Sequence, residues 1–426
     1  MTLLPSPQHD DAPAWVDEHL SHLTLEGPGR TNPSERFRGG QTAADEALQR
    51  FGVSGYARNR NEVLPLRRRG ASGLSPYIRH GLLTLPDVWE HAARSGAPRN
   101  DIEKFHDELL WQEYARHLYA RIGSDLHEPL RAIPLRRNIA HDPWDRSMAC
   151  ISMVLNELEH DGWAVNQTRM WLASQWSVRH AADWHEGEQR FFAHLLDGSR
   201  AANLTGWQWT IGTGTGKPYG FSRWQVEKRA PGLCHTCTYK ARCPISDWPD
   251  TPEQARPLDT PDQRLRYDAT PEHTGGPTVV ENTGVPAQAV WITAESLGNA
   301  DPAVVANPHL PIVFVFDEPL LIELRLSSKR LVFLTETLAE LADLTGRLEV
   351  HLGDPVAILT GRRVATTFAP VPGWRRRTAR IKPVEFHPWP WLARPQSGSA
   401  QSFSSWRSNA GTRARRPKSH TGRPAE

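Results

Sequence analysis

The hydrophobic pattern of the chain changes after its midpoint, and this change limits the folds that the sequence can adopt. From about Ala44 to Trp248, apolar residues recur at helical steps, as in "DIEKFHDELLWQEYARHLYARIG", where Trp111, Tyr114 and Leu118 share one face. Beyond residue 286 the pattern becomes short apolar, β-branched runs, "AVWITA" and "LPIVFVFDEP", which are typical of buried parallel strands. The sequence therefore predicts an all-helical part followed by an α/β part.

Composition divides the chain further into five segments. We predict an N-terminal extension at 1–43, a helical domain at 44–248, and a linker at 249–286, which is rich in Pro, Asp and Thr. The α/β domain covers 287–395, with "SSKRLVFLTETLAELADL" as a crossover helix before the strand "LEVHLGD". Residues 396–426 are rich in Ser, Arg and Pro without an apolar period, which predicts a disordered basic tail.

Length and charge set limits on function. The 426 residues are 38% hydrophobic, which is enough for two cores. No segment approaches a membrane span and no apolar stretch follows a basic start, so we expect a soluble cytoplasmic protein with no membrane partner. Because the net charge is only +2, binding of nucleic acid would need a local basic surface. The 17 Trp outnumber the 7 Tyr and the 12 Phe, and indole rings both stack on flat ligands and pass single electrons.

Three of the four cysteines lie close together in "GLCHTCTYKARCPISDWPD", namely Cys234, Cys237 and Cys243, while Cys150 lies far upstream. A C-x2-C pair can direct two thiolates at one soft metal ion, and the other two cysteines would complete a four-thiolate site. A disulfide is disfavoured because nothing marks the chain for export. A structural zinc ion, a redox-active thiol pair and cysteines without a ligand stay open as alternatives.

Four sequence motifs follow one another between about Tyr56 and Trp248: "SGLSPYIRHGLL", "DELLWQEYARHL", "WAVNQTRMWLAS" and "ADWHEGEQRFFAHLLDGSRAANLTGWQWTIGTGTGKPY". As an ordered set they resemble the FAD-binding domain of the cryptochrome/DNA photolyase family. The later words "VWITAESLGNADPAVV" and "LPIVFVFDE" resemble the α/β domain that normally opens such proteins. The resemblance implies a circularly permuted, multidomain α and α/β protein: an all-helical photolyase FAD-binding domain followed by a Rossmann-like α/β photolyase antenna-type domain.

The resemblance also implies which residues contact FAD. Arg169 would pair with Asp197 across the flavin ring, and Asn203 would lie beside flavin N5. The remaining expected contacts are Tyr56, Ser72, Leu74, Ser75 and Ser199. Two positions depart from the family, because Ala71 stands where a Thr is usual and Ser199 where an Asp is common. The plain alternative for "ASGLSPY" is an ordinary serine N-cap.

On the substrate side, Glu108 and Trp111 share a helix face and match the acid and the stacking ring that receive a cyclobutane pyrimidine dimer. Asn166, Met170 and Trp209 would line the same pocket. Light-excited FADH⁻ would donate an electron, the dimer would split, and the electron would return. Trp207 and Trp184 match the first two members of the family's electron-transfer chain. The ordinary role of buried tryptophan rings, however, is core packing.

One bacterial branch of this family carries a [4Fe-4S] cluster, and the resemblance assigns Cys150, Cys234, Cys237 and Cys243 to it, with zinc as the alternative. That branch includes enzymes acting on (6-4) photoproducts through a histidine pair, where this chain has Val165 and Asn166. Cyclobutane dimers are therefore the favoured lesion. In the α/β domain, an antenna chromophore of unknown identity and a merely covering role are both open.

The resulting hypothesis is a light-dependent DNA repair flavoprotein, a carbon–carbon lyase that acts on UV-damaged DNA as a monomer. The alternative from a different class is a cryptochrome-like blue-light photoreceptor without repair activity. The changes at Ala71 and Ser199 leave room for it, and so does Gln112, which stands where the family has an arginine after the stacking Trp. A third reading is a permuted relic that binds FAD structurally. Preferential binding of dimer-containing DNA distinguishes the first hypothesis from the other two.

Overall fold

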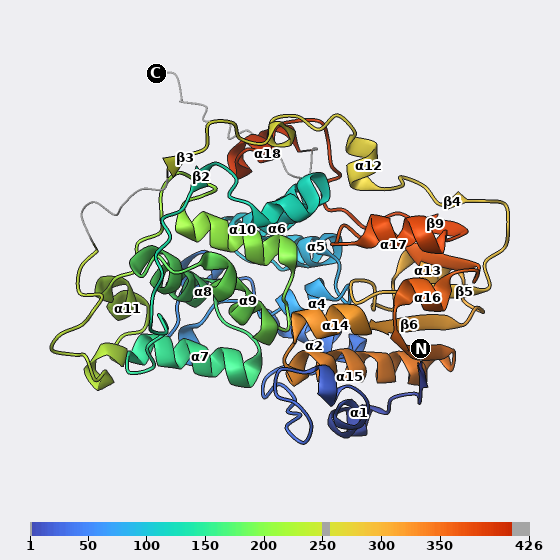
Figure 1. Cartoon of the computed structure of the whole chain (residues 1–426), viewed down its shortest axis with the longest axis horizontal. Coiled ribbons are helices and arrows are strands. Elements are labelled where there is room, and N and C mark those ends of the chain that lie inside the picture. The colour runs from blue at the N-terminus through green and yellow to red at the C-terminus, as the bar shows by residue number, and fades with distance from the viewer. Residues whose placement is uncertain (1, 249–255, 411–426) are drawn as a thin grey trace.

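The computed structural model describes residues 2–248 and 256–410, and it contains a helical region beside a sheet that is covered by helices on both faces (Figure 1). The predicted mixture of all-helical and α/β parts is confirmed. Among these residues, no helix combines the length and the apolar character that a bilayer span requires.

The helical region begins with α2 and ends with α11. Its longest member is the 24-residue α6, which starts after Pro98. The C-cap of α10 is Gly212, whose φ of 84° suits glycine. A π-helical turn, Ser174–Arg179, follows α8 directly. The helices are α2 (Gln41–Arg50), α3 (Tyr56–Asn59), α4 (Ser75–Arg79), α5 (Leu85–Arg94), α6 (Arg99–Ile122), α7 (Ala149–Asp161), α8 (Asn166–Ala173), α9 (Trp184–His194), α10 (Arg200–Ile211) and α11 (Arg223–Arg229).

The sheet has seven strands in the order β1-β7-β6-β5-β8-β9-β4. The five central strands are parallel. Along the chain, β6 and β7 are added on one side of β5, and β8 and β9 are then added on the other side, so the strand order reverses between β5 and β8. The strands are β1 (Thr2–Leu4), β4 (Glu281–Asn282), β5 (Ala289–Ile292), β6 (Ile312–Asp317), β7 (Leu348–Gly353), β8 (Val364–Thr367) and β9 (Glu385–His387).

Two edge strands come from segments that the sequence did not assign to the sheet. β1 belongs to the predicted N-terminal extension and pairs antiparallel with β7, and β4 belongs to the predicted linker and pairs antiparallel with β9. The helical region also contains a short strand, β2 (Ala132–Ile133), paired with β3 (Arg256–Pro257). The prediction of an all-helical first half and a plain linker was incomplete at these points.

Helices cover both faces of the sheet. The side chains of β5 alternate: Val290 and Ile292 join the core that continues into the helical region, and Ala289 and Trp291 join a smaller core on the opposite face. The helices associated with the sheet are α13 (Pro302–Ala306), α14 (Glu318–Leu324), α15 (Ser328–Thr345), α16 (Pro355–Leu359) and α17 (Trp374–Ile381). The predicted crossover helix is α15, and nearly all of its first fourteen residues are buried.

The N-terminal extension packs along α15. Its helix α1 (Ala12–His19) lies beside α15 (Figure 1). The backbone N–H of Gly39 donates to Glu336 at 2.6 Å, and that of Gly40 donates to Thr337 at 3.0 Å. A Cβ atom at Gly39 would lie 2.1 Å from the carbonyl oxygen of Phe333, so the close approach requires glycine there.

The C-terminal segment is more ordered than the sequence predicted. Disorder was expected from residue 396, but α18 (Phe403–Asn409) packs on α6, with the Trp406 indole donating to His117 at 2.8 Å. Tyr114 and Arg121, also on α6, donate to backbone carbonyls of this segment at 2.9 Å each. The prediction of disorder was wrong for residues 396–410. Two aromatic rings and these hydrogen bonds hold the segment in place, although its sequence has no regular apolar period. The rest of the predicted tail lies outside the described residues.

Truncation of Leu331 on α15 should destabilise the protein strongly. Its side chain is fully buried between the sheet and the helical region, so Leu331→Ala is expected to lower the free energy of unfolding by about 2–5 kcal/mol. Leu344→Ala on the same helix is the control, because Leu344 is 61% exposed and its loss should change stability by about 0.5 kcal/mol or less. Urea unfolding followed by circular dichroism measures both; equal effects would contradict the central placement of α15.

Candidate functional site

A cavity of about 930 Å³ lies between the helical region and the carboxyl ends of the central strands. Its helical wall comes from α3, α4, α6, α8, α9 and α10, and its other wall includes the residues that follow β5 and the end of β6. In open α/β sheets, ligands bind outside the carboxyl ends of strands where the strand order reverses. The cavity is therefore the strongest candidate for a functional site.

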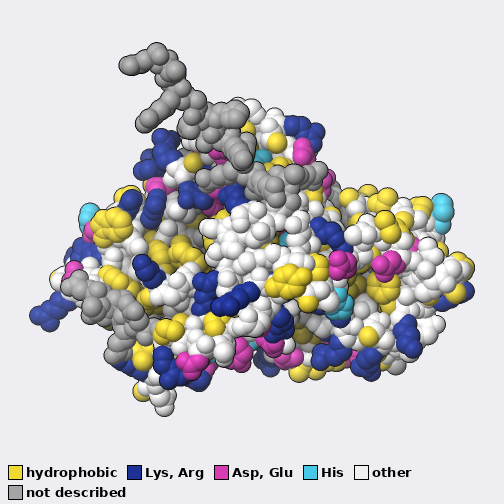
Figure 2. Space-filling view, turned by 90° about the horizontal axis from the view of Figure 1, so that it is seen from above, with side chains coloured by type: hydrophobic (Ala, Val, Ile, Leu, Met, Phe, Trp, Pro, Cys, Tyr) yellow, Lys and Arg dark blue, Asp and Glu magenta, His cyan; other side chains and the backbone are white. Residues whose placement is uncertain are grey.

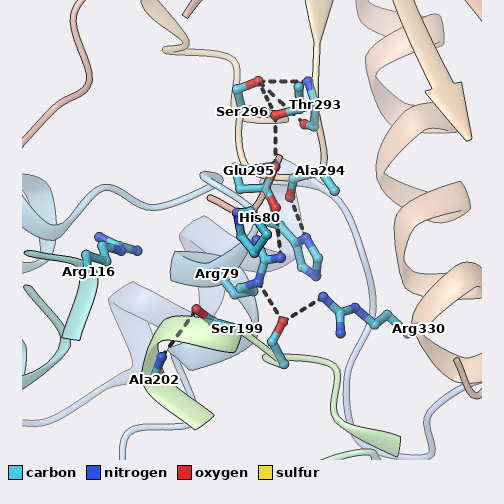
Figure 3. Close-up of polar contacts among 12 residues, drawn as sticks. Arg79, His80, Arg116, Ser199, Ala202, Thr293, Ala294, Glu295, Ser296 and Arg330 are labelled. Atoms are coloured by element: carbon cyan, nitrogen blue, oxygen red, sulfur yellow. Dashed lines mark hydrogen bonds and ion pairs between the residues drawn. The ribbon is translucent and has the colours of Figure 1, made fainter. Parts of the chain in front are cut away.

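Most residues expected to contact FAD line this cavity: Tyr56, Ser72, Ser75, Arg169, Asp197, Ser199 and Asn203. Leu74 is fully buried beneath the wall and does not line it. The Ser199 hydroxyl serves as the N-cap of α10 and accepts from the Ala202 N–H at 3.5 Å (Figure 3). Burial and the Glu108 carboxylate raise the pKa of Tyr56, so its hydroxyl is protonated at neutral pH.

Arg169 and Asp197 form an ion pair across one side of the cavity, with Nη2 and Oδ2 2.7 Å apart. Arg169 Nε also donates to the Ala164 carbonyl at 2.8 Å, which fixes the guanidinium plane. The second carboxylate oxygen of Asp197, Oδ1, is buried and accepts no hydrogen bond within the described part of the chain. A buried acceptor without a donor is costly, so a flat ring carrying an N–H group, such as the isoalloxazine of FAD, fits this wall.

Asn203 is held in place by Glu188, a residue that sequence reasoning missed. The Asn203 amide donates to Glu188 Oε1 at 2.6 Å, and Arg200 donates to Glu188 Oε2 at 2.6 Å. Glu188 is 2% exposed, and its buried charge is balanced by this arginine. Its position one helical turn after Trp184 on α9 could have indicated an inward-facing carboxylate.

The residues predicted for the substrate side also reach the cavity: Glu108, Trp111, Asn166, Met170 and Trp209. Glu108 Oε1 already pairs with Lys104 at 2.9 Å and with Arg60 at 3.2 Å, and Trp209 is 38% exposed. One face of the Trp111 indole is stacked on Phe403 of α18, with ring centroids 3.9 Å apart and an angle of 10° between planes. This contact was not foreseen, because Phe403 lies in the segment predicted to be disordered.

The buried tryptophans near the cavity include rings that the sequence did not assign to electron transfer. Trp207 lines the cavity, and both Trp207 and Trp176 pack against the backbone of Gly187. Trp176 in turn contacts Trp144, with centroids 4.8 Å apart. The predicted second member, Trp184, is buried beside His185 at 4.0 Å. Trp176 was missed because it lies on the π-helical turn after α8, where helical spacing no longer indicates the face.

The four cysteines line one small cavity of about 20 Å³, between α7 and the loop after α11. All four are free thiols, and the Ala149 N–H donates to Cys237 Sγ at 3.5 Å. Burial and the neighbouring thiols raise the pKa of Cys150 to about 12. Throughout residues 2–248 and 256–410, no group of three or more His, Cys, Asp or Glu side chains has the arrangement of a metal site. The predicted convergence of the cysteines is thus observed, whereas metal binding stays a prediction.

Comparison with known proteins finds a family match within the helical region that forms one wall of the cavity. Residues 105–229 match a family model described as the FAD binding domain of DNA photolyase. This segment is similar to the FAD-binding domain of DNA photolyases. It contains α10 and the Arg169–Asp197 pair, so the match covers a large part of the helical side of the cavity.

Individual relatives cover part of the chain. It is 31% identical over 192 residues to the deoxyribodipyrimidine photo-lyase of Synechococcus sp., covering 41% of this chain and 39% of the relative. The corresponding Thermus thermophilus protein is 32% identical over 221 residues, covering 49% and 50%. A solved bacterial class III photolyase from Agrobacterium tumefaciens is 26% identical, with a TM-score of 0.40, and covers 45% of this chain and 42% of that one. The chain therefore matches at most half the length of each of these proteins.

Removal of the Asp197 charge should weaken FAD binding. Asp197→Asn leaves the Arg169 guanidinium without its partner and removes a charged acceptor from the cavity, so the FAD dissociation constant is expected to rise roughly 10- to 100-fold. Titration of flavin fluorescence measures the change. The control, Asp343→Asn, alters an exposed carboxylate on α15 and should leave FAD affinity unchanged; an unaltered dissociation constant in Asp197→Asn would contradict the placement of the flavin.

Proposed function

We propose that the chain binds FAD in the large cavity and is a light-dependent repair enzyme for cyclobutane pyrimidine dimers in UV-damaged DNA. The observation that carries the proposal is the Arg169–Asp197 pair in the family-matched segment, with its second carboxylate oxygen buried and without a donor. When bound, reduced FAD would supply the electron that splits the dimer. The chain's own residues bind and orient the reactants.

The flavin end of the cavity supports this assignment. Arg169, Asp197 and Asn203 present one cation, one carboxylate and one anchored amide along a single wall. Such a wall can bind the polar edge of a flavin while burial excludes water. Ser72 and Ser75 lie on the same cavity at the start of α4, where their hydroxyls and neighbouring N–H groups would bind the phosphates.

The tryptophans would carry electrons between solvent and the flavin. Trp207 lies on the cavity wall, and Trp176 and Trp144 extend from it by close ring packing. We therefore extend the predicted relay, Trp207 with Trp184, by Trp176 and Trp144. Arg190 lies over both Trp144 and Trp176, at 4.9 and 5.9 Å, and a cation there disfavours a lasting positive charge on either ring.

The substrate end would receive the flipped-out dimer. Trp111, Met170 and Trp209 offer flat and apolar surfaces, and Glu108 and Asn166 offer polar groups for the edge of the bases. Figure 2 shows Lys and Arg side chains around an apolar recess over the helical half of the molecule. This face would supply the local basic surface that DNA binding requires, given a net charge of only +2.

The α/β part completes the proposal. We propose that the chain is a circularly permuted photolyase in which the sheet follows the FAD-binding domain. The cavity continues to Trp291 and Trp374, whose rings stack at 5.3 Å, and to Trp389. These rings would suit a flat antenna chromophore, whose identity the residues do not specify.

A cryptochrome-like photoreceptor is the second candidate, and two contacts favour it. Phe403 covers one face of Trp111, and Glu108 is already paired with Lys104 and Arg60. Both groups would have to exchange these contacts for contacts with a lesion. Repair and photoreception differ in one measurement, since only repair requires tighter binding of dimer-containing DNA than of undamaged DNA.

Replacement of Glu108 should slow repair without releasing the flavin. Glu108→Ala removes the acid expected to stabilise the dimer radical anion, so the blue-light repair rate of a dimer-containing oligonucleotide should fall roughly 10-fold or more. Glu103→Ala is the control, because Glu103 lies on the same helix α6 but its side chain is 51% exposed. Normal repair by Glu108→Ala, or no repair by the wild-type chain, would contradict the proposed enzyme.

The cysteine cavity fits a four-thiolate cofactor by its donor set, and we propose a [4Fe-4S] cluster with zinc as the alternative. Cys150, Cys234, Cys237 and Cys243 would hold it, and it would supply structural support or electron relay. Anaerobically purified protein should contain about four iron atoms per chain, and Cys150→Ser should lose most of them. Ser152→Ala, on the same helix, is the control. One zinc ion per chain would instead indicate a structural metal site. An absence of both iron and zinc would contradict the proposal.

A further inference from the structure

The side chain of Arg330 reaches from the α/β part to the backbone of the FAD-binding domain. Arg330 lies on α15, it is 4% exposed, and it is one of the residues that line the large cavity. Its Nη2 donates to the Gly198 carbonyl at 2.7 Å and its Nη1 to the Leu195 carbonyl at 3.4 Å. Arg79 of α4 donates to the same Gly198 carbonyl at 2.7 Å, so two arginines from different parts of the chain meet at this point (Figure 3).

His80 holds the same loop from a third direction. Its ring nitrogens lie 3.0 Å from the Leu196 carbonyl and 2.7 Å from the Ala294 carbonyl, which follows β5 (Figure 3). Two carbonyls of the 195–198 loop, those of Leu195 and Gly198, thus accept from arginine side chains, and the Leu196 carbonyl faces the His80 ring. The fourth residue, Asp197, directs its carboxylate to Arg169 instead.

The sequence is adapted to this contact at Gly198. A Cβ atom there would lie 2.5 Å from Arg330 Nη1 and 3.2 Å from both the Leu195 carbonyl oxygen and the Phe192 ring. The Phe192 ring itself has Arg200 4.0 Å and Arg330 5.2 Å from its centroid. The guanidinium of Arg330 is therefore fixed between backbone and ring.

The charge of Arg330 is not neutralised by direct contact with a carboxylate. In the described part of the chain no carboxylate oxygen lies within 4.0 Å of it, whereas Arg79 pairs with Glu295 at 2.8 Å. The charged groups that influence Arg330 are Arg79, Glu295, Asp197 and Arg200, and burial lowers its pKa to about 9. A fixed cation on the wall of a buried cavity favours a negative charge inside that cavity.

We infer that Arg330 is a positioning residue that the α/β part contributes to the flavin site: it holds the 195–198 loop so that Asp197 faces the bound flavin, and its charge favours the anionic reduced flavin. The inference rests on the proposed binding of FAD in this cavity. It adds that the α/β part helps to determine both the affinity and the reduction potential of the flavin.

Two substitutions in the full chain separate the hydrogen bonds from the charge. Arg330→Met removes both, so the FAD dissociation constant should rise roughly 10-fold and the flavin reduction potential should fall. Arg330→Lys keeps the charge but loses the forked donors, so affinity should fall while the potential stays near the wild-type value. Arg380→Met, an exposed position on α17, is the control and should change neither quantity.

Potentials are measured by spectroelectrochemical titration and affinities by flavin fluorescence. Unchanged affinity and potential in Arg330→Met would overturn the inference, and so would a potential that falls equally in Arg330→Lys. Should Arg330→Met fail to fold, Gly198→Ala displaces the guanidinium by a single methyl group, and unaltered FAD affinity in that variant would overturn it. A wild-type chain that binds no FAD would instead contradict the proposed function on which the inference rests.

Discussion

The burial of nearly all of the first fourteen residues of α15 is the constraint on which the rest of the structure depends. This part of the helix lies between the sheet, the N-terminal extension and the helical region, so its buried polar side chains must find partners inside the protein (Figure 1). Glu336 accepts from the Gly39 N–H, Lys329 lies 3.7 Å from Glu26, and Arg330 donates to the loop that carries Asp197. These contacts join segments distant in sequence into one packed body, and the large cavity obtains walls from both parts of the chain.

The same constraint explains the chemistry of the cavity. Charged groups at this depth are tolerated only in pairs or with several hydrogen bonds, and Arg169–Asp197, Arg79–Glu295 and Arg200–Glu188 meet that requirement. Such pairs orient one another. Asp197 Oδ1 and Thr205 Oγ1, on residues that line the cavity, are buried oxygens without a hydrogen-bond partner in the described part of the chain, so a ligand with polar groups suits the cavity better than an apolar molecule would.

Much of this arrangement could be predicted from the sequence, and the failures have physical causes. The parallel strands β5, β6 and β7 and the crossover helix α15 follow from apolar runs and helical spacing, and the resemblance placed Arg169, Asp197 and Asn203 on one cavity. Strands β1 and β4 were missed because two or three residues carry no period, and their pairing is decided by distant partners. α18 was missed because contacts with α6, and not an apolar pattern of its own, stabilise it. The inward face of Glu188 could be inferred from its spacing to Trp184, but the partners of Glu188, Trp176 and Arg330 come from other elements, and only the tertiary structure brings them together.

The most direct test of the account is the absorption spectrum of the purified full chain after incubation with FAD and removal of free flavin by gel filtration. If the cavity is a flavin site built from both parts of the chain, an equimolar amount of FAD should remain bound, with an absorption spectrum altered from that of free flavin by the buried charges. A folded but colourless protein would contradict the central claim, because the Arg169–Asp197 wall would then serve only to close the interface.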